Sequence, residues 1–178
     1  MVYTIGHSTR TLEDFIALLK NAGVTMVADV RTVPRSRHNP QFNANALPQS
    51  LKQAGIGYRH LAGLGGLRHA LPDSVNTGWH NPSFRGFADY MQTPAFTDAL
   101  QGLVAPAQHE TVAIMCAEAV PWRCHRSLIA DALVVRGMSV NHIISGISWR
   151  THVLTPWAHV EGERVTYPPH GDSNSVPL

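Results

Sequence analysis

The sequence predicts an α/β domain, with a mainly parallel sheet flanked by helices on both faces in a three-layer sandwich. Segments of strand character and segments of helical character alternate along most of the chain, as in proteins with parallel sheets. Residues 24–30 form a β-branched apolar run, which is typical of a strand buried on both faces. With 178 residues and 44% hydrophobic content, the chain fits one domain with a sizeable core.

The predicted strands are short apolar runs at residues 2–5, 24–30, 56–61, 112–115 and 140–144. The predicted helices cover residues 11–22, 44–54, 84–91, 93–104 and 126–136. Thr11 with Asp14 resembles a capping box, and Thr93 before Pro94 gives an N-cap followed by proline at the first helical position. Gly23, Gly55 and Gly137 are placed to end three of the helices.

Three other stretches complete the predicted organisation. Residues 62–85 are rich in glycine and proline and form a long connection, which in a compact domain is usually functional. Residues 147–167 are expected to add a hairpin or an edge strand. Residues 168–178 have little to bury and are expected to form a loose tail after a single domain at 1–167.

Composition excludes several classes of protein. The net charge is only +2, from 14 basic and 12 acidic residues, so charge alone does not indicate nucleic-acid binding. Two cysteines do not make a disulfide scaffold, and the 11 histidines are spread out rather than clustered as in a metal-binding tract. No apolar run approaches membrane-spanning length, so we expect no membrane association and a cytoplasmic protein. The sequence indicates no particular cofactor.

Polar side chains stand just beyond the predicted carboxyl ends of the strands. Ligand sites in open parallel sheets form at this edge. The residues concerned are His7, Ser8, Asp29, Arg31, His60, Cys116 and Glu118. The pattern therefore predicts one shared site, although loops are polar in general and loop composition is the alternative explanation.

Cys116 ends a buried strand and faces the start of a helix, where a thiolate is most easily stabilised. We interpret it as a nucleophile or key polar contact, stabilised by the helix dipole, backbone N–H groups and Arg123 or Arg126. The alternative is a small buried hydrophobic residue. Glu118 would repel a bound phosphate, so it is expected to act as a general acid or base, or as a metal ligand. With His125 it would handle protons, which makes Cys116, Glu118 and His125 the candidate catalytic residues.

Basic residues near these positions suggest an anionic ligand. Arg126 in a first helical turn is unfavourable unless a negative group lies nearby. Arg31, Arg35 and Arg37 could clamp a phosphate or carboxylate together with Ser36, or the loop could simply be solvated. Asp29 and Arg31 could equally form a structural salt bridge. The candidate substrate-binding residues are His7, Ser8, Asp29, Arg31, Ser36, Arg37 and Arg126.

Several motifs resemble those of the family called domain of unknown function 488. They are T-I-G-H-S at 4–8, D-V-R-T-V-P-R-S-R at 29–37, L-G-G at 64–66, C-A-E at 116–118 and C-H-R-S-L-I-A at 124–130. The resemblance runs from about residue 2 to residue 144 and implies an α/β fold with polar signature residues around one site. A looser similarity is to rhodanese and cysteine-phosphatase folds. The chain departs from the phosphatase loop, because six residues separate Cys116 from Arg123 and both Glu118 and Pro121 interrupt it.

Three functions follow as hypotheses. The first is an enzyme that acts on an anionic small molecule or a nucleotide-like group at the strand ends. The second is a metal-binding protein that uses Cys116, Cys124 and either His7 or His125, although no repeated Cys-x-x-Cys spacing is present. The third is a nucleic-acid-binding or processing module built on the basic loop at 31–37.

Overall fold

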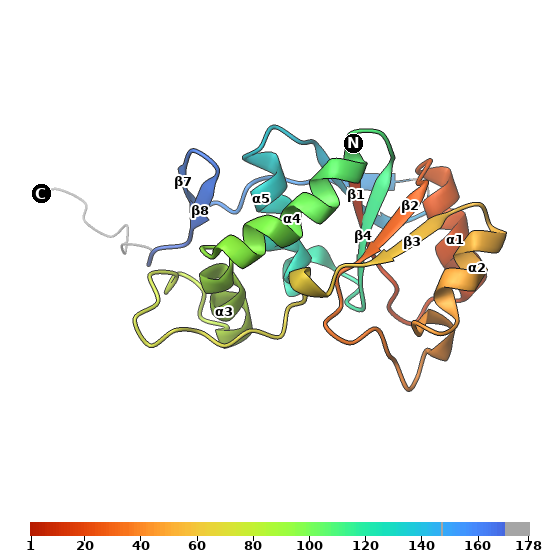
Figure 1. Ribbon diagram of the computed structural model, residues 1–178, viewed down its shortest axis with the longest axis horizontal. Helices are drawn as coiled ribbons and strands as arrows, with labels where there is room; N and C mark the ends of the chain where they lie inside the picture. The colour runs from red at the N-terminus through yellow and green to blue at the C-terminus, as the bar shows by residue number, and fades with distance from the viewer. Residues whose placement is uncertain (147, 170–178) are drawn as a thin grey trace, which may run out of the picture.

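A six-stranded sheet forms the centre of the protein in the computed structural model, which describes residues 1–146 and 148–169 (Figure 1). The strand order is β3-β2-β4-β1-β5-β6, and all neighbours pair in parallel except β5 and β6. The strands are β1 (Val2–Gly6), β2 (Met26–Asp29), β3 (Gly57–His60), β4 (Val112–Cys116), β5 (Val140–Ser145) and β6 (Ser148–Thr151). The predicted mainly parallel sheet is confirmed.

Five α-helices cover the two faces of this sheet, which confirms the predicted three-layer sandwich in a single compact domain (Figure 1). They are α1 (Leu12–Asn21), α2 (Leu47–Gln53), α3 (Pro82–Tyr90), α4 (Pro94–Ala107) and α5 (Arg126–Val134). Short 3₁₀ turns lie at η1 (Pro40–Phe42), η2 (Ala62–Leu64) and η3 (Pro121–Arg123). The last of these separates β4 from α5.

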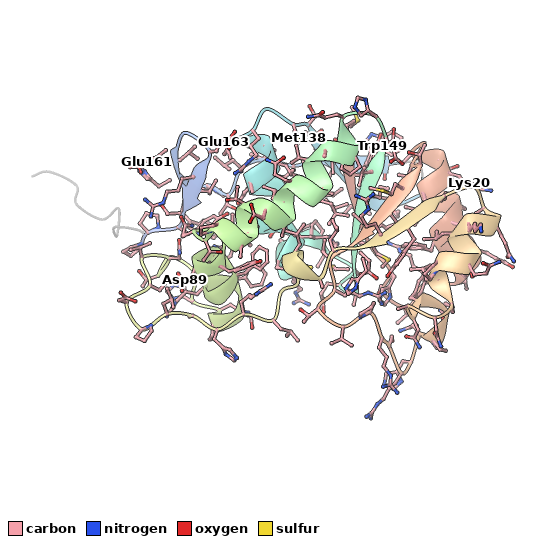
Figure 2. The ribbon with its side chains drawn as sticks, viewed as in Figure 1. Lys20, Asp89, Met138, Trp149, Glu161 and Glu163 are labelled. Carbon is pink, nitrogen blue, oxygen red and sulfur yellow. The ribbon has the colours of Figure 1, made fainter. Side chains whose placement is uncertain are left out.

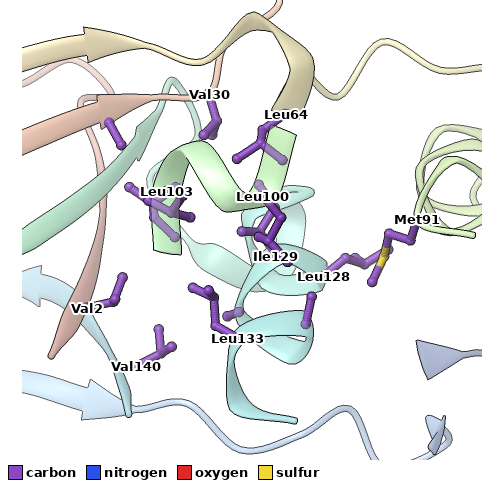
Figure 3. Packing of buried hydrophobic residues seen from close by; sticks show 14 of the residues in the cluster. Val2, Val30, Leu64, Met91, Leu100, Leu103, Leu128, Ile129, Leu133 and Val140 are labelled. Carbon is purple, nitrogen blue, oxygen red and sulfur yellow. The ribbon is translucent and has the colours of Figure 1, made fainter. Parts of the chain in front are cut away.

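Alternate residues of the central strands point to opposite faces, because side chains in a strand have a period of two. Ile5, Val27 and Met115 pack on one face in a cluster that also contains Phe15 of α1 and Leu51 of α2. The second cluster lies on the other face and is contributed by the sheet together with α3, α4 and α5 (Figure 3). Its labelled members are Val2, Val30, Leu64, Met91, Leu100, Leu103, Leu128, Ile129, Leu133 and Val140. Burial of each large apolar side chain stabilises the fold by about 1.5–3 kcal/mol.

The helix starts follow the expected capping chemistry. Thr11 accepts a hydrogen bond from the backbone N–H of Asp14, and Thr93 accepts one from the N–H of Phe96. The helix predicted at 84–91 begins two residues earlier, because Asn81 caps it and Pro82 occupies its first turn. The Asn-Pro pair carried the signal that was missed in the sequence.

Residues 62–85 contain little regular structure, as predicted, but their path is fixed by hydrogen bonds. The carboxylate of Asp89 on α3 accepts bonds from the Leu71 N–H, the Ser74 hydroxyl and the Asn76 amide (Figure 2). Asp89 is 5% exposed, so these three donors satisfy a buried charge. This connection brings Gly66 to the carboxyl edge of the sheet, beside His125.

The C-terminal region contains both alternatives that the sequence left open. Strand β6 is an antiparallel edge strand, and β7 (His159–Glu161) pairs with β8 (Arg164–Thr166) in a separate hairpin. Asp131 on α5 accepts hydrogen bonds from His152, Thr155 and Tyr167, which fixes this region to the domain. Of the predicted tail, residues 170–178 lie outside the described part. Within the described residues, no helix has the length and apolarity needed to cross a membrane.

Candidate functional site

The carboxyl ends of four parallel strands meet at one edge of the sheet. Gly6 pairs with Cys116, while Asp29 pairs with both His60 and Met115. The strand ends therefore stand side by side, as the edge argument from the sequence requires. The loop after β4 crosses this edge and returns through η3 into α5.

Cys116 is in direct contact with the buried guanidinium of Arg126. The Nη1 atom of Arg126 donates to the Cys116 Sγ at 2.5 Å, and both side chains are almost fully buried. A guanidinium is always charged in proteins, so a negative partner is needed when it is removed from water. The Cys116 sulfur is the group placed to be that partner, so Arg126 is engaged within the fold and is not a free anion binder.

The second cysteine lies against the first. The two Sγ atoms are 2.8 Å apart and both thiols are free. Burial opposes ionisation of Cys116, but the hydrogen bond from Cys124, the charge of Arg126 and its hydrogen bond lower the Cys116 pKa to about 7. The same contact with Cys116, together with burial, raises the pKa of Cys124. Near neutral pH, Cys116 is therefore partly ionised, whereas Cys124 keeps its proton.

The loop after Cys116 is held by hydrogen bonds from β1 and from Arg126. The N–H groups of His7 and Ser8 donate to the carbonyls of Cys116 and Ala117, so the β1–β4 pairing continues beyond the strands. Arg126 donates to the carbonyls of Glu118 and Ala119 at 2.6 and 3.0 Å. At Gly6, an added Cβ would lie 1.7 Å from the Glu118 carbonyl oxygen. Only glycine permits this close passage of the loop.

His125 lies partly buried between Cys124 and the 62–85 connection. Its Nε2 donates to the carbonyls of Val30 and Leu64, at 3.2 and 3.0 Å. Its Nδ1 is then unprotonated and lies 3.6 Å from the Cys124 Sγ. Burial lowers the pKa of His125 to about 4 despite these two carbonyls, so the ring is neutral and is a weak base. A Cβ on Gly66 would clash with this ring at 2.5 Å, which gives the L-G-G motif its physical reason.

Asp29 and Arg31 form a buried ion pair, the structural alternative considered for them from the sequence. The Arg31 Nη2 lies 2.6 Å from the Asp29 carboxylate, which also accepts a bond from the Tyr58 hydroxyl. Arg31 also donates to the His7 Nε2 and to the Phe42 carbonyl. Burial lowers the pKa of His7, so this ring is a neutral acceptor stacked on Phe42. These contacts hold Arg31 in place at the edge of the site.

A cavity of about 430 Å³ opens beside the two sulfur atoms. It is lined by Arg31, Thr32, Val33, Arg35, Gly66, Leu67, Ser83, Phe84, Cys116, Ala117, Glu118, Arg123, Cys124 and His125. Four of the candidate residues from the sequence are thus together on one wall: Arg31, Cys116, Glu118 and His125. The Glu118 side chain is exposed at this wall, and only its backbone carbonyl contacts Arg126.

The other candidate residues do not line the cavity. His7 and Asp29 lie behind Arg31, and Arg126 lies behind Cys116. Ser8 has a positive φ of 46° and joins the β1–β4 ladder through its backbone. Ser36 bonds Asn39 and Asn43 within its own loop, and Arg37 is exposed there. Of the clamp predicted from Arg31, Arg35, Arg37 and Ser36, only the first two line the cavity.

Two further basic residues and the second cysteine also lie at the cavity. Arg35, which the sequence suggested only as part of the clamp, lines it together with Arg123, and Cys124 faces it beside Cys116. Cys116 ends β4 and Cys124 lies in the short loop that follows, which was the available signal for their contact. Arg123 was considered only as a partner of the thiolate, a position that Arg126 takes in the structure.

The arrangement does not resemble a metal centre. Among residues 1–146 and 148–169, no group of three or more His, Cys, Asp or Glu residues could hold a metal ion. His125 donates its Nε2 proton to carbonyls, and His7 accepts a bond from Arg31. His7 is thus engaged elsewhere, whereas His125 keeps its Nδ1 beside Cys124.

The family comparison agrees with the motifs around this site. A family model described as domain of unknown function DUF488 matches residues 11–133, more than half of the chain and a span that includes Cys116, Cys124 and Arg126. No curated protein and no solved structure matches the chain. The protein therefore belongs to the DUF488 family.

Proposed function

We propose that this protein is an enzyme that uses the Cys116 thiolate to attack an anionic small molecule. The observation that carries the proposal is the 2.5 Å contact between Arg126 and the Cys116 Sγ, made beside an open cavity. A thiolate is the reactive form of cysteine, and catalytic cysteines are found in such electropositive, partly accessible places. A purely structural cysteine would have no need of a buried guanidinium.

The cavity supports an anionic substrate of modest size. Its volume of about 430 Å³ falls in the range typical of small-molecule sites. Arg35 and Arg123 are exposed cations on its lining, whereas Arg31 is already neutralised by Asp29. The two free arginines are the anion-binding groups in the proposal, and they replace Arg37 and Ser36 in that role.

Two polar groups lie beside the sulfurs in this enzyme. The neutral His125 ring places its Nδ1 3.6 Å from the Cys124 Sγ, where it can accept a hydrogen bond from that thiol. Glu118 carries its carboxylate at the cavity wall in contact with solvent, where it can exchange protons with a substrate or leaving group. Glu118 also disfavours highly charged ligands, so the proposal favours a carboxylate-bearing substrate over a phosphate.

The resemblance to rhodanese and cysteine-phosphatase folds stays a prediction, and it raises the question whether this cysteine loop binds an anion as theirs does. Those enzymes hold an anion in the backbone of the cysteine loop. Here the carbonyls of Glu118 and Ala119 point to Arg126, so this part of the loop offers acceptors rather than donors. This orientation favours attack on a substrate positioned by side chains. The proposal includes a cytoplasmic location, since reduced thiols persist there.

Alkylation of Cys116 tests the proposal. At pH 7, iodoacetamide should alkylate Cys116 at least ten times faster than it alkylates the thiol of free glutathione. The reason is that about half of Cys116 is ionised at its pKa of about 7. Benzoate or sulfate should slow the labelling by occupying the cavity. Peptide mass spectrometry identifies the labelled residue, and C116S is the control. Labelling no faster than glutathione, with no protection by either anion, would remove the proposal.

A further inference from the structure

We propose that Cys116 and Cys124 form a redox pair that reduces small anionic disulfides by thiol–disulfide exchange. The inference rests on the proposed function, since it keeps Cys116 as the nucleophile and the cavity as the substrate site. It adds a second sulfur to the reaction and specifies the class of bond that is broken. The carrying observation is that both sulfurs line one cavity and touch each other.

The distance between the sulfurs suits bond formation. The Sγ atoms are 2.8 Å apart, and a disulfide bond is about 2.05 Å long. Closing the bond therefore needs a movement of less than about 1 Å. Cys124 follows the three residues of η3, whereas Cys116 is the last residue of β4, so the turn is the part that can adjust.

The two thiols have different protonation states, as exchange requires. Cys116 is the thiolate, held by Arg126, and is the attacking sulfur. Cys124 keeps its proton and lies between the Cys116 Sγ and the His125 Nδ1. It can resolve a mixed disulfide as its proton passes to the departing sulfur. An attacking thiol with a pKa near the ambient pH reacts fastest in such exchange.

The reaction balances in two steps. The Cys116 thiolate attacks one sulfur of the substrate disulfide, a mixed disulfide forms, and the other half leaves as a thiolate. Cys124 then attacks the Cys116 sulfur, and its proton passes to the departing second half, which leaves as a thiol. The substrate gains two electrons, the cysteine pair loses two, and a low-molecular-weight thiol must reduce the pair again.

The charge of the cavity selects the substrate. Arg35 and Arg123 stand on the same lining as both sulfurs, so each half of a dicarboxylate disulfide can meet a cation. Glu118 is an acidic residue on the same lining, and its negative charge disfavours the binding of more than one negative group next to it. A cationic disulfide would be repelled by the arginines.

The probe for the test is dithiobis(nitrobenzoate), a disulfide with two carboxylates whose thiolate product is coloured. The wild-type protein should release two coloured thiolates per chain in two phases. Intact mass should then show a chain lighter by two hydrogens and without adduct. C124A should release one thiolate and retain the nitrobenzoate adduct on Cys116. Replacement of Arg123 by Gln should slow the first phase several-fold, while the reaction of cystamine should not slow.

The outcomes separate this inference from the proposed function. Wild-type chains that carry one or two stable adducts, with rapid iodoacetamide labelling of Cys116, would overturn the redox pair and leave the nucleophile intact. Slow reaction of Cys116 with both reagents would overturn both. Because the decisive count is made on the wild-type protein, it does not depend on the folding of any variant.

Discussion

Two buried arginines lie at the same edge of the sheet, and their charges are compensated in different ways. Arg31 pairs with the carboxylate of Asp29 at 2.6 Å. Arg126, among the residues that the structure describes, has no carboxylate partner, and it contacts the Cys116 sulfur and two backbone carbonyls. A buried charge needs a counter-charge in either case. Arg31 thus stabilises the fold through an ion pair with Asp29, whereas Arg126 in the folded protein favours ionisation of the Cys116 thiol.

The largest effect is expected on stability, when the buried ion pair between Asp29 and Arg31 is broken. Replacement of Asp29 by Asn leaves the Arg31 guanidinium buried without its counter-charge and should lower the free energy of unfolding by about 3–5 kcal/mol. Urea denaturation measures this loss. Alkylation of Cys116 in the folded variant should change less than about threefold, because Asp29 does not touch the sulfur. A larger change in alkylation would show that the two arginines are not independent.

The second effect concerns the arginine that faces the sulfur. R126Q should return the pKa of the Cys116 thiol to its ordinary range or above, so that only a few per cent of Cys116 is ionised at pH 7. The alkylation rate should fall about 20-fold or more. R126K keeps the positive charge and is the matched control, with a smaller fall. Equal loss in both variants, with folding confirmed by circular dichroism, would mean that geometry rather than charge lowers the Cys116 pKa.

The pH dependence gives a third, smaller effect. Alkylation of Cys116 should rise about tenfold between pH 6 and pH 8, with its midpoint at about 7. The folded pKa is lowered relative to the unfolded chain, so ionisation stabilises the fold fully above the unfolded pKa of about 8.5. This stabilisation is lost as the pH falls through about 7. Comparison of unfolding free energies of the wild type and C116A from pH 9 to pH 6 should show the difference shrinking; a constant difference would argue against a native thiolate.

The smallest effect is expected at Glu118. Its side chain is exposed and only its carbonyl meets Arg126, so E118Q should leave the intrinsic alkylation rate within about twofold. Protection of Cys116 by sulfate should become slightly stronger, because a like charge leaves the cavity wall. A fall of tenfold or more in alkylation would instead assign the carboxylate a direct part in activating the thiol.

The comparison also shows which parts could be predicted from the sequence. The alternation of buried side chains in β1, β2 and β4 follows from local pattern, and so do the caps at Thr11 and Thr93. The gathering of strand ends follows from the parallel sheet. These features depend on periodicities and on short-range chemistry, which a single sequence carries.

The contacts within the site could not be predicted in the same way. The place of Arg126 behind Cys116 depends on the path of the loop over Gly6, and that of His125 depends on a connection more than 50 residues away in sequence. The spacing alone favoured Arg123 and Arg126 equally as partners of the thiolate. Long-range packing decides between them, and it places Arg123 at the cavity.

The continuation of the β1–β4 ladder past Gly6 and Cys116 has a consequence for how this loop can vary in length. Backbone pairing fixes the first residues of the loop to the sheet, and η3 alone sets how far Cys124 returns. An insertion between residues 118 and 123 would therefore separate the sulfurs while leaving Cys116 and its strand in place. The seven residues between the cysteines set the distance between the two sulfurs, so the length of this segment, more than its composition, matters to the pair.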